Sequence, residues 1–350
     1  MSPNTLINGT LSNLNNTLSG TYTNSTDDTV TLTGSHFKNP LFLAPIAINA
    51  TCALAFIILT TASWLKKRDI QGSRRVFAAM ITLLVAMTSS FIRTLIDEVI
   101  HEYEFSVPKA YLILPSLKPV LDNSTMIGLV AMMYHIAKNR NQWVCGDSMG
   151  YLWWQRAHHL AVTTLTLFAL ADTVLYIYAQ VLLWGQIDVS QINPKVLEAA
   201  NSYGQVHITY TTLYLVVTIE ILVWAICVAW KAWQQNLRSR IITYVVILIS
   251  PFLILRSATT LVFAVLYTYE SHTEARWTGV IETALWGLPS IAIFTGLVLI
   301  QYRKDWQPDY RYENTDAILE HGPVTETVNV VTEWPDESWK GPHIQRYYSH

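Results

Sequence analysis

Apolar residues form long, nearly uninterrupted stretches along this chain, separated by short segments rich in polar and basic residues. A helix that crosses a bilayer needs about 20 mostly apolar residues, because the hydrocarbon offers no partner for backbone amides. Six stretches meet this requirement, and a seventh, 111–137, nearly does, since polar residues interrupt its first half. The predicted spans are 41–65, 76–100, 111–137, 159–184, 208–230, 241–267 and 280–300. The pattern therefore predicts an all-α fold, a seven-transmembrane helix bundle.

Basic residues in the connecting segments indicate the orientation of this bundle. The first, third and fifth connections carry eleven lysines and arginines, whereas the amino-terminal tail and the alternate connections carry four. Because short cytoplasmic loops are enriched in these residues, the amino terminus is predicted outside and the carboxyl terminus in the cytoplasm. This alternation requires all seven crossings. If 111–137 were instead a loop followed by half a helix, six spans would remain and both ends would share one side.

Two polar tails flank the predicted membrane domain, which covers 41–300. The tail 1–40 is rich in Asn, Thr and Ser, and we expect it to be disordered and extracytoplasmic. It contains glycosylation sequons at Asn8, Asn15 and Asn24. The alternative is that these sequons arise by chance in an Asn/Thr-rich tract. The tail 301–350 contains four prolines and scattered acids without an apolar period, which predicts a disordered cytoplasmic segment.

Composition supports a membrane location and argues against a nucleic-acid partner. Of the 350 residues, 51% are hydrophobic and only 14% are charged, against about a quarter charged in soluble domains. A net charge of -2 leaves no basic excess for contacts with phosphates. Membrane lipid is therefore the expected surrounding, in either the plasma membrane or the endoplasmic reticulum.

Ionisable residues inside the predicted spans are the candidate functional residues, because each costs at least about 2.5 kcal/mol at a helix centre. Arg93 and Asp97 are four residues apart on one span, and Lys118 and Asp122 repeat that spacing on the next, so each pair can neutralise itself. The complete set of candidate ligand-binding residues is Arg93, Asp97, Lys118, Asp122, Asp172, Glu220, Arg256 and Glu282.

These charges are expected at particular depths. Alternating helix directions place most of them toward the outer end, with Asp172, Glu220 and Arg256 near the middle, and leave the cytoplasmic third almost uncharged. A polar funnel that opens outward above an apolar floor explains this distribution. The alternative is a set of structural ion pairs that hold the helices together. Asp172 and Glu220 have no basic residue one helical turn away, so we expect them to be the neutral acids of the set.

Histidine spacing does not favour a metal centre. His135, His158, His159 and His207 show neither a His-x-x-x-His nor a His-Glu-x-x-His pattern. The span 280–300 contains no lysine that could bind retinal as a Schiff base. The sequence therefore predicts no metal and no cofactor.

The last two predicted spans carry a sequence resemblance. The step Leu255-Arg256-Ser257 is followed by Glu282 and Pro289. In this order of residues the chain resembles the fungal lipid-translocating exporter family. It departs from that family where Thr259 and Thr260 replace a second arginine and glutamate.

The chain is also similar in length and topology to seven-helix proteins that accompany fungal terpenoid and indole-diterpene biosynthesis. The two resemblances imply a fungal membrane protein of secondary metabolism that handles a lipophilic small molecule.

Three functions remain open at this point. The first is a non-catalytic membrane protein that binds or moves a lipophilic small molecule. The second is a membrane-embedded terpene cyclase, in which a protonated Asp172 or Glu220 would be the catalytic acid and aromatic side chains would stabilise the developing cation. The third is an orphan seven-helix receptor, supported by topology and by the long carboxyl-terminal tail.

Overall fold

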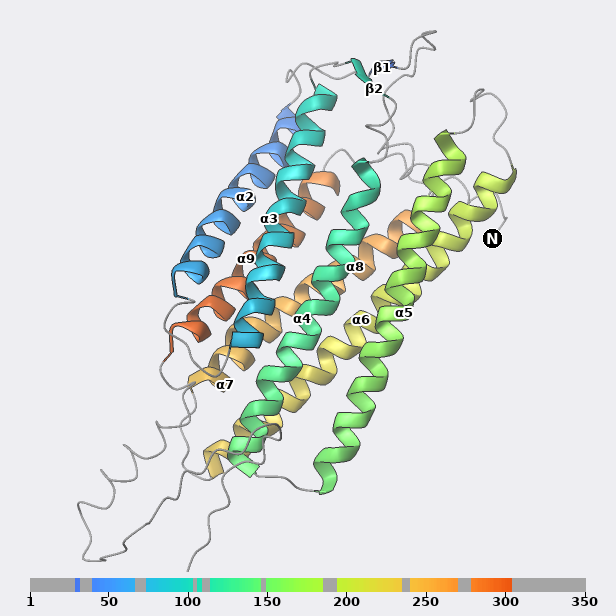
Figure 1. Ribbon diagram of the computed structural model, residues 1–350. Helices are drawn as coiled ribbons and strands as arrows, with labels where there is room; N and C mark the ends of the chain where they lie inside the picture. The colour runs from blue at the N-terminus through green and yellow to red at the C-terminus, as the bar shows by residue number, and fades with distance from the viewer. Residues whose placement is uncertain are drawn as a thin grey trace, which may run out of the picture. The chain divides into compact units, whose positions relative to one another are not determined.

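The computed structural model of the protein describes residues 29–31, 40–66, 74–102, 106–108, 114–145, 149–184, 194–234, 240–269 and 278–303. Long helices make up nearly all of these residues (Figure 1). They are α2 (Pro40–Lys66), α3 (Arg74–Glu102), α4 (Leu114–Cys145), α5 (Met149–Trp184), α6 (Pro194–Gln234), α8 (Ser250–Tyr269) and α9 (Thr278–Gln301). The predicted helical fold is therefore confirmed. Helices enclose six of the seven predicted spans, and α4 contains the remaining span, 111–137, from Leu114 onward.

The helix before Pro251 contains a widened turn. The short α7 (Arg240–Tyr244) continues through a π-helical turn, η3 (Val245–Ile249), into α8. The Ser250 amide donates to the Val245 carbonyl, five residues back. Proline has no N–H, and its ring clashes with the carbonyl four residues earlier, so the wider turn lets one continuous helix pass this position.

Six of the helices are long and apolar enough to cross a membrane, namely α2, α3, α5, α6, the continuous segment from α7 to α8, and α9. The exception among the long helices is α4. Its 32 residues extend about 48 Å, which is longer than a bilayer core, but its first half is polar. The described residues thus form a multi-pass membrane protein.

Consecutive helices contact one another and close into a ring. In chain order, α2, α3, α4, α5, α6, α8 and α9 each touch the next, and α9 returns to α2. In addition, α4 contacts α6 across the ring. The ring gives α4 neighbours on three sides, so its polar residues can face protein rather than lipid.

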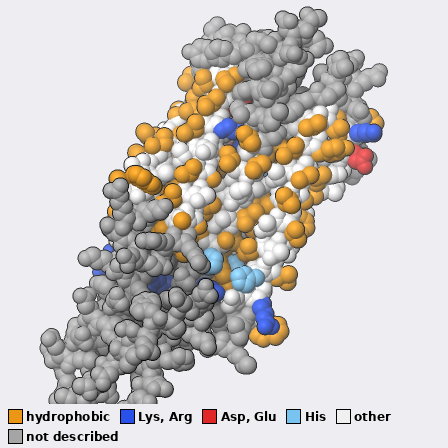
Figure 2. Space-filling model, viewed as in Figure 1, with side chains coloured by type: hydrophobic (Ala, Val, Ile, Leu, Met, Phe, Trp, Pro, Cys, Tyr) orange, Lys and Arg blue, Asp and Glu red, His pale blue; other side chains and the backbone are white. Residues whose placement is uncertain are grey.

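The bundle buries a cluster of three phenylalanines and exposes many aliphatic side chains on its outside. Phe56 stacks on Phe91 and meets the edge of Phe294, and all three rings are fully buried. By contrast, Leu167 and Ile247 remain 63% and 70% exposed. On the described part of the face in Figure 2, apolar side chains are spread along the length of the bundle, and basic and acidic side chains lie toward its ends. An apolar exterior of this extent is suited to lipid.

A short two-stranded sheet lies at one end of the bundle. Strand β1 (Thr29–Thr31) pairs antiparallel with β2 (Ser106–Pro108), which belongs to the connection between α3 and α4. Part of the predicted tail 1–40 thus lies beside this connection (Figure 1). The sequons at Asn8, Asn15 and Asn24 lie outside the described residues, as does almost all of 301–350.

Candidate functional site

Charges from three helices converge on Asp122, a partly buried residue of α4. Lys118 of the same helix, Arg256 of α8 and Arg93 of α3 attract its carboxylate electrostatically. The Ser90 hydroxyl of α3 donates a hydrogen bond of 2.7 Å to Asp122 Oδ1. Four of the eight residues predicted for the site therefore interact around one carboxylate.

Two predicted neighbour pairs have different geometries. Arg93 Nη2 lies 3.2 Å from Asp97 Oδ2, in the expected i,i+4 ion pair. Lys118, in contrast, is exposed, and Asp122 takes its hydrogen bond from Ser90 of the neighbouring helix. The interaction of Lys118 with Asp122 is electrostatic attraction at longer range.

Arg256 of α8 is a fully buried charged residue. Its side chain is 0% exposed, and none of its three guanidinium nitrogens has a hydrogen-bond partner among the described residues. The guanidinium carbon lies 5.1 Å from the centre of the Trp286 ring of α9, a cation–π contact. On α6, the hydroxyl of the fully buried Tyr214 also lacks a partner, and Arg256 acts on this phenol electrostatically.

Asp172 belongs to a network that joins three helices. It is 1% exposed, and its Oδ2 accepts a 3.0 Å hydrogen bond from the Asn123 amide of α4. Its Oδ1 lies 2.9 Å from Nδ1 of His207 on α6. The His207 ring stacks on Tyr203 one turn earlier in the same helix. Asp172 has no basic neighbour on its own helix, as the sequence indicates, but it has polar partners on two others.

Glu220 lies in a different cluster. Nδ1 of the buried His158 of α5 is 3.3 Å and 3.4 Å from its two carboxylate oxygens. The His158 ring stacks on Tyr134 of α4 at 3.9 Å between centroids, and Tyr134 also meets Trp224. His158 is 14 residues before Asp172 on α5, a distance of about 21 Å along the helix. The expectation that Asp172 and Glu220 share one depth is therefore wrong, because each carboxylate pairs with a histidine at a different level.

Glu282, the last predicted residue, is held by a neighbouring helix. Its carboxylate accepts a short hydrogen bond from the Tyr267 hydroxyl at the end of α8. A similar contact involves Glu98 of α3, which accepts a 2.8 Å hydrogen bond from Asn49 of α2. Both contacts lie near the end of the bundle where α3 ends and α9 begins.

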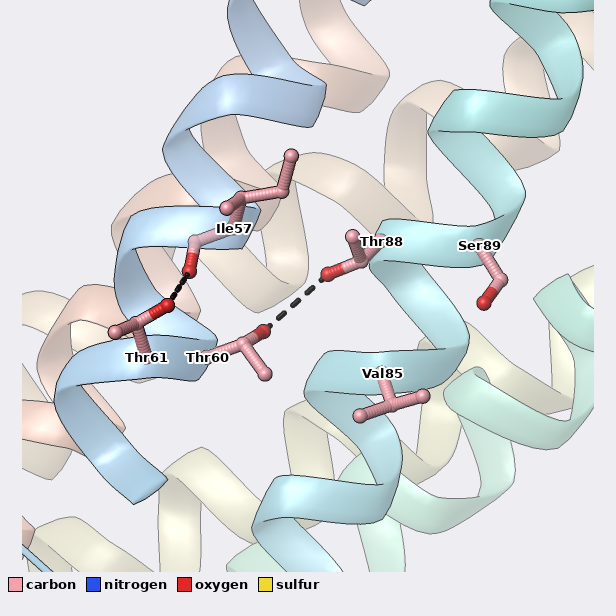
Figure 3. A pocket seen from close by; sticks show the side chains of 6 residues that line it. All are labelled: Ile57, Thr60, Thr61, Val85, Thr88 and Ser89. Atoms are coloured by element: carbon pink, nitrogen blue, oxygen red, sulfur yellow. Dashed lines mark hydrogen bonds between the residues drawn. The ribbon is translucent and has the colours of Figure 1, made fainter. Parts of the chain in front are cut away.

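Two shallow hollows are prominent on the described surface, and neither contains a predicted site residue. One, of about 170 Å³, lies between α2 and α3 and is lined by Ile57, Thr60, Thr61, Val85, Thr88 and Ser89. Figure 3 shows Thr60 and Thr88 facing each other across it, with their hydroxyl oxygens 3.3 Å apart. The other, of about 250 Å³, lies between α2 and α9 and is lined by Ala47, Ile48, Thr51, Cys52, Ala284 and Leu288.

Sequence reasoning missed the neutral and histidine partners of the buried acids. Asn123 and Asn49 lie within predicted spans, and both are buried hydrogen-bond donors. An amide inside an apolar span was the available signal, since a buried polar group needs a partner. Within the described residues, no three His, Cys, Asp or Glu side chains are grouped to hold a metal ion.

Comparison of the chain with models of protein families, with curated proteins and with solved structures finds no match.

Proposed function

We propose that the protein crosses the membrane seven times, with its amino terminus outside, and that it binds or translocates a lipophilic small molecule. The binding region is the polar cluster around Asp122 and Arg256, in the half of the bundle that faces away from the cytoplasm. The position of α4 supports the seventh crossing, because this helix contacts α3, α5 and α6. The basic residues of the alternate connections support the orientation.

One observation carries the proposal of a binding site. Arg256 is fully buried and has no hydrogen-bond partner among the described residues, whereas Arg93 reaches Asp97. Charged groups inside a membrane bundle are costly, and they typically mark the path or the site of a ligand. Within the proposal, Asp97, Lys118 and Glu282 line the outer approach, and the Asn123, Asp172 and His207 network forms one wall.

The resemblance of the last two spans to the fungal lipid-translocating exporter family extends this proposal. Arg256 and Ser257 belong to the residues that carry the resemblance, and Ser257 shares a 3.1 Å hydrogen bond with Thr218 of α6. This contact fixes the turn of α8 that presents Arg256 to the interior. A role in fungal secondary metabolism is part of the same proposal.

The proposed function is tested by purifying the wild type and variants that lack a charged residue of the cluster. Wild-type protein extracted in mild detergent is expected to retain a lipophilic small molecule, detected by mass spectrometry of its organic extract. Arg256→Ala and Asp122→Ala should lose this molecule, because they remove opposite charges of the same site.

Arg240→Ala is the matched control for this experiment. It also removes an arginine, but Arg240 is exposed at the start of α7 and lies away from the cluster. The control should retain the molecule as the wild type does. The proposal would be contradicted if the organic extracts of all four proteins contained the same lipophilic molecules in the same amounts.

A further inference from the structure

Three helices bring titratable side chains together at a second level of the bundle, apart from the proposed binding region. Nδ1 of His158 on α5 lies 3.3 Å and 3.4 Å from the two carboxylate oxygens of Glu220 on α6. The His158 ring stacks on Tyr134 of α4. The ring centres of His135 and His159 lie 5.8 Å and 5.5 Å from that of the same tyrosine. These side chains take no part in the proposed binding region.

The charge of the Glu220 pair depends on protons, because its partner is a histidine. Within the described part of the chain, Glu220 pairs with His158 and with no lysine or arginine. With one proton, on Nδ1 of His158, the pair carries a single negative charge, and a second proton makes it neutral. Since a net charge is costly inside a membrane bundle, the surroundings favour the state that holds the second proton.

The other groups that pack around this pair do not supply a counter-ion at hydrogen-bond distance. On α4, Lys138 lies one turn after Tyr134 and acts electrostatically on His135, as do His158 and His159. Tyr134 itself is under the electrostatic influence of Glu220. From α7 and η3 come two apolar side chains that pack beside Tyr134, Ile242 and Val246. The proton is therefore the cation at hand for the Glu220 carboxylate.

Asp172 is a second acid paired with a histidine, but its surroundings differ. One of its oxygens contacts His207, and the other accepts a hydrogen bond from the amide of Asn123. The amide is a donor at any pH, so it stabilises the charged carboxylate without a proton. Both oxygens of Glu220, in contrast, share one imidazole nitrogen. Of the two acids, Glu220 is therefore the one whose charge depends more on a bound proton.

The pair lies near one end of the bundle and has a path to water. His158 is nine residues after Met149, the start of α5, or about 14 Å along the helix. Glu220 is 22% exposed, His159 is exposed, and histidine side chains reach the surface in the lower half of Figure 2. The buried Nε2 of His158 and the hydroxyl of Tyr134 have no partner among the described residues. Buried polar atoms of this kind typically bind ordered water, which can carry protons.

We propose that Glu220 and His158 form a proton-binding site near the cytoplasmic end of the bundle, and that loss of this proton releases the lipophilic ligand. The proton comes from water, is held between the imidazole and the carboxylate, and returns to water. Its loss leaves a charge where α5 and α6 meet, and these helices also carry Asp172 and His207 of the proposed binding region. The proton site depends on its own geometry, whereas its effect on the ligand rests on the proposed function.

Infrared titration of the purified protein tests the proton site without any ligand. A protonated carboxyl and a carboxylate absorb at different frequencies, and exposed carboxyls are ionised above about pH 5.5. Between about pH 5.5 and 8.5, the wild type should lose a protonated-carboxyl band that Glu220→Gln lacks. Other buried carboxyls cancel in the difference between the two proteins. Glu198→Gln is the matched control, because Glu198 is an exposed acid of the same helix, and its spectrum should change with pH as that of the wild type does.

Retention of the lipophile at two pH values tests the effect on the ligand. Wild-type protein purified in mild detergent should retain several-fold more of the molecule at about pH 5.5 than at about pH 8.5. Glu220→Gln should retain, at both pH values, as much as the wild type does in acid. The reason is that the neutral amide imitates the protonated carboxyl, and its oxygen still accepts a hydrogen bond from His158. Glu198→Gln should follow the wild type.

The other outcomes contradict one proposal or the other. If Glu220→Gln removes no titrating band, or melts well below the wild type in acid, the carboxylate is a structural partner of His158 and the proton site is overturned. Equal wild-type retention at both pH values, or a pH dependence that persists in Glu220→Gln, would overturn the link to the ligand. Wild-type extracts without a lipophile at either pH would overturn the proposed function, and the infrared titration would still decide the proton site.

Discussion

Single amide side chains link helices of this bundle in places where an apolar sequence suggests only packing. Asn123 of α4 donates to Asp172 and to Thr173 on α5, at 3.0 Å in both cases. Asp172 in turn contacts His207 of α6. Since lipid offers no competing hydrogen bonds, a polar side chain of this kind fixes the rotation of its helix more sharply than aliphatic contacts do.

Asn123→Leu is expected to destabilise the protein by about 1–2 kcal/mol, because it leaves Asp172 Oδ2 buried without its donor. The melting temperature in detergent is the measurement. Ser124→Ala is the matched control, since Ser124 is the next residue of the same helix and is exposed. Equal melting temperatures for both variants would show that the amide contributes no stability.

Close helix contacts in the ring depend on glycine where a side chain would not fit. A Cβ at Gly296 of α9 would lie 2.6 Å from Cγ1 of Ile249, in the π-helical turn before α8. At Gly287, a Cβ would lie 2.6 Å from the Cys52 sulfur of α2. The approach of α9 to both of its neighbours therefore requires small residues on two of its faces.

Gly296→Ala should destabilise the protein by about 1–3 kcal/mol, because the added methyl forces Ile249 and the π-helical turn to shift. Gly279→Ala provides a control in the same helix, since a Cβ there has open space. That variant should change stability by no more than about 1 kcal/mol, in the direction of greater stability. Thermal unfolding of both proteins in detergent distinguishes the two effects, and a Gly296→Ala protein as stable as wild type would contradict the close contact.

For the molecule as a whole, the contacts that close the ring of helices also decide where α4 lies. Helix α4 is the least apolar of the long helices, yet it packs against α3, α5 and α6, so protein covers much of its surface. A seventh crossing is compatible with this packing. It would also place the two ends of the chain on opposite sides of the membrane, as the basic residues of the connections predict.

Glycosylation and tag accessibility test this topology. Glycosidase treatment should lower the apparent mass of the wild type, and replacing Asn8, Asn15 and Asn24 with Gln should abolish the shift. An epitope tag at the carboxyl terminus should not react with antibody on intact cells, and it should react once the plasma membrane alone is permeabilised with digitonin. Glycosylation together with a tag that reacts on intact cells, or that reacts only after internal membranes are permeabilised as well, would mean that the ends share one side, which requires an even number of crossings.

The length of the apolar stretches was sufficient to predict the helices, because a bilayer demands about 20 apolar residues per crossing and leaves little choice of secondary structure. Six of the seven predicted spans lie wholly within helical segments of the structure, and the seventh, 111–137, lies in α4 from Leu114 onward. The i,i+4 pair of Arg93 and Asp97 was also predictable, since both partners lie on one helix.

Only the tertiary structure decided which polar groups meet between helices. The partners of Asp172 and Glu220 come from other helices, so their identity depends on the rotation and depth of each helix, which an apolar pattern does not specify. On α5, Asp172 lies about 21 Å from His158, the partner of Glu220, so the two carboxylates are at different depths. Arg256 is buried without a hydrogen-bonded counter-ion among the described residues. The sequence by itself determined that charges enter the membrane domain, and packing determined which of them are neutralised there, because a charge separated from water depends on the few atoms within hydrogen-bond reach.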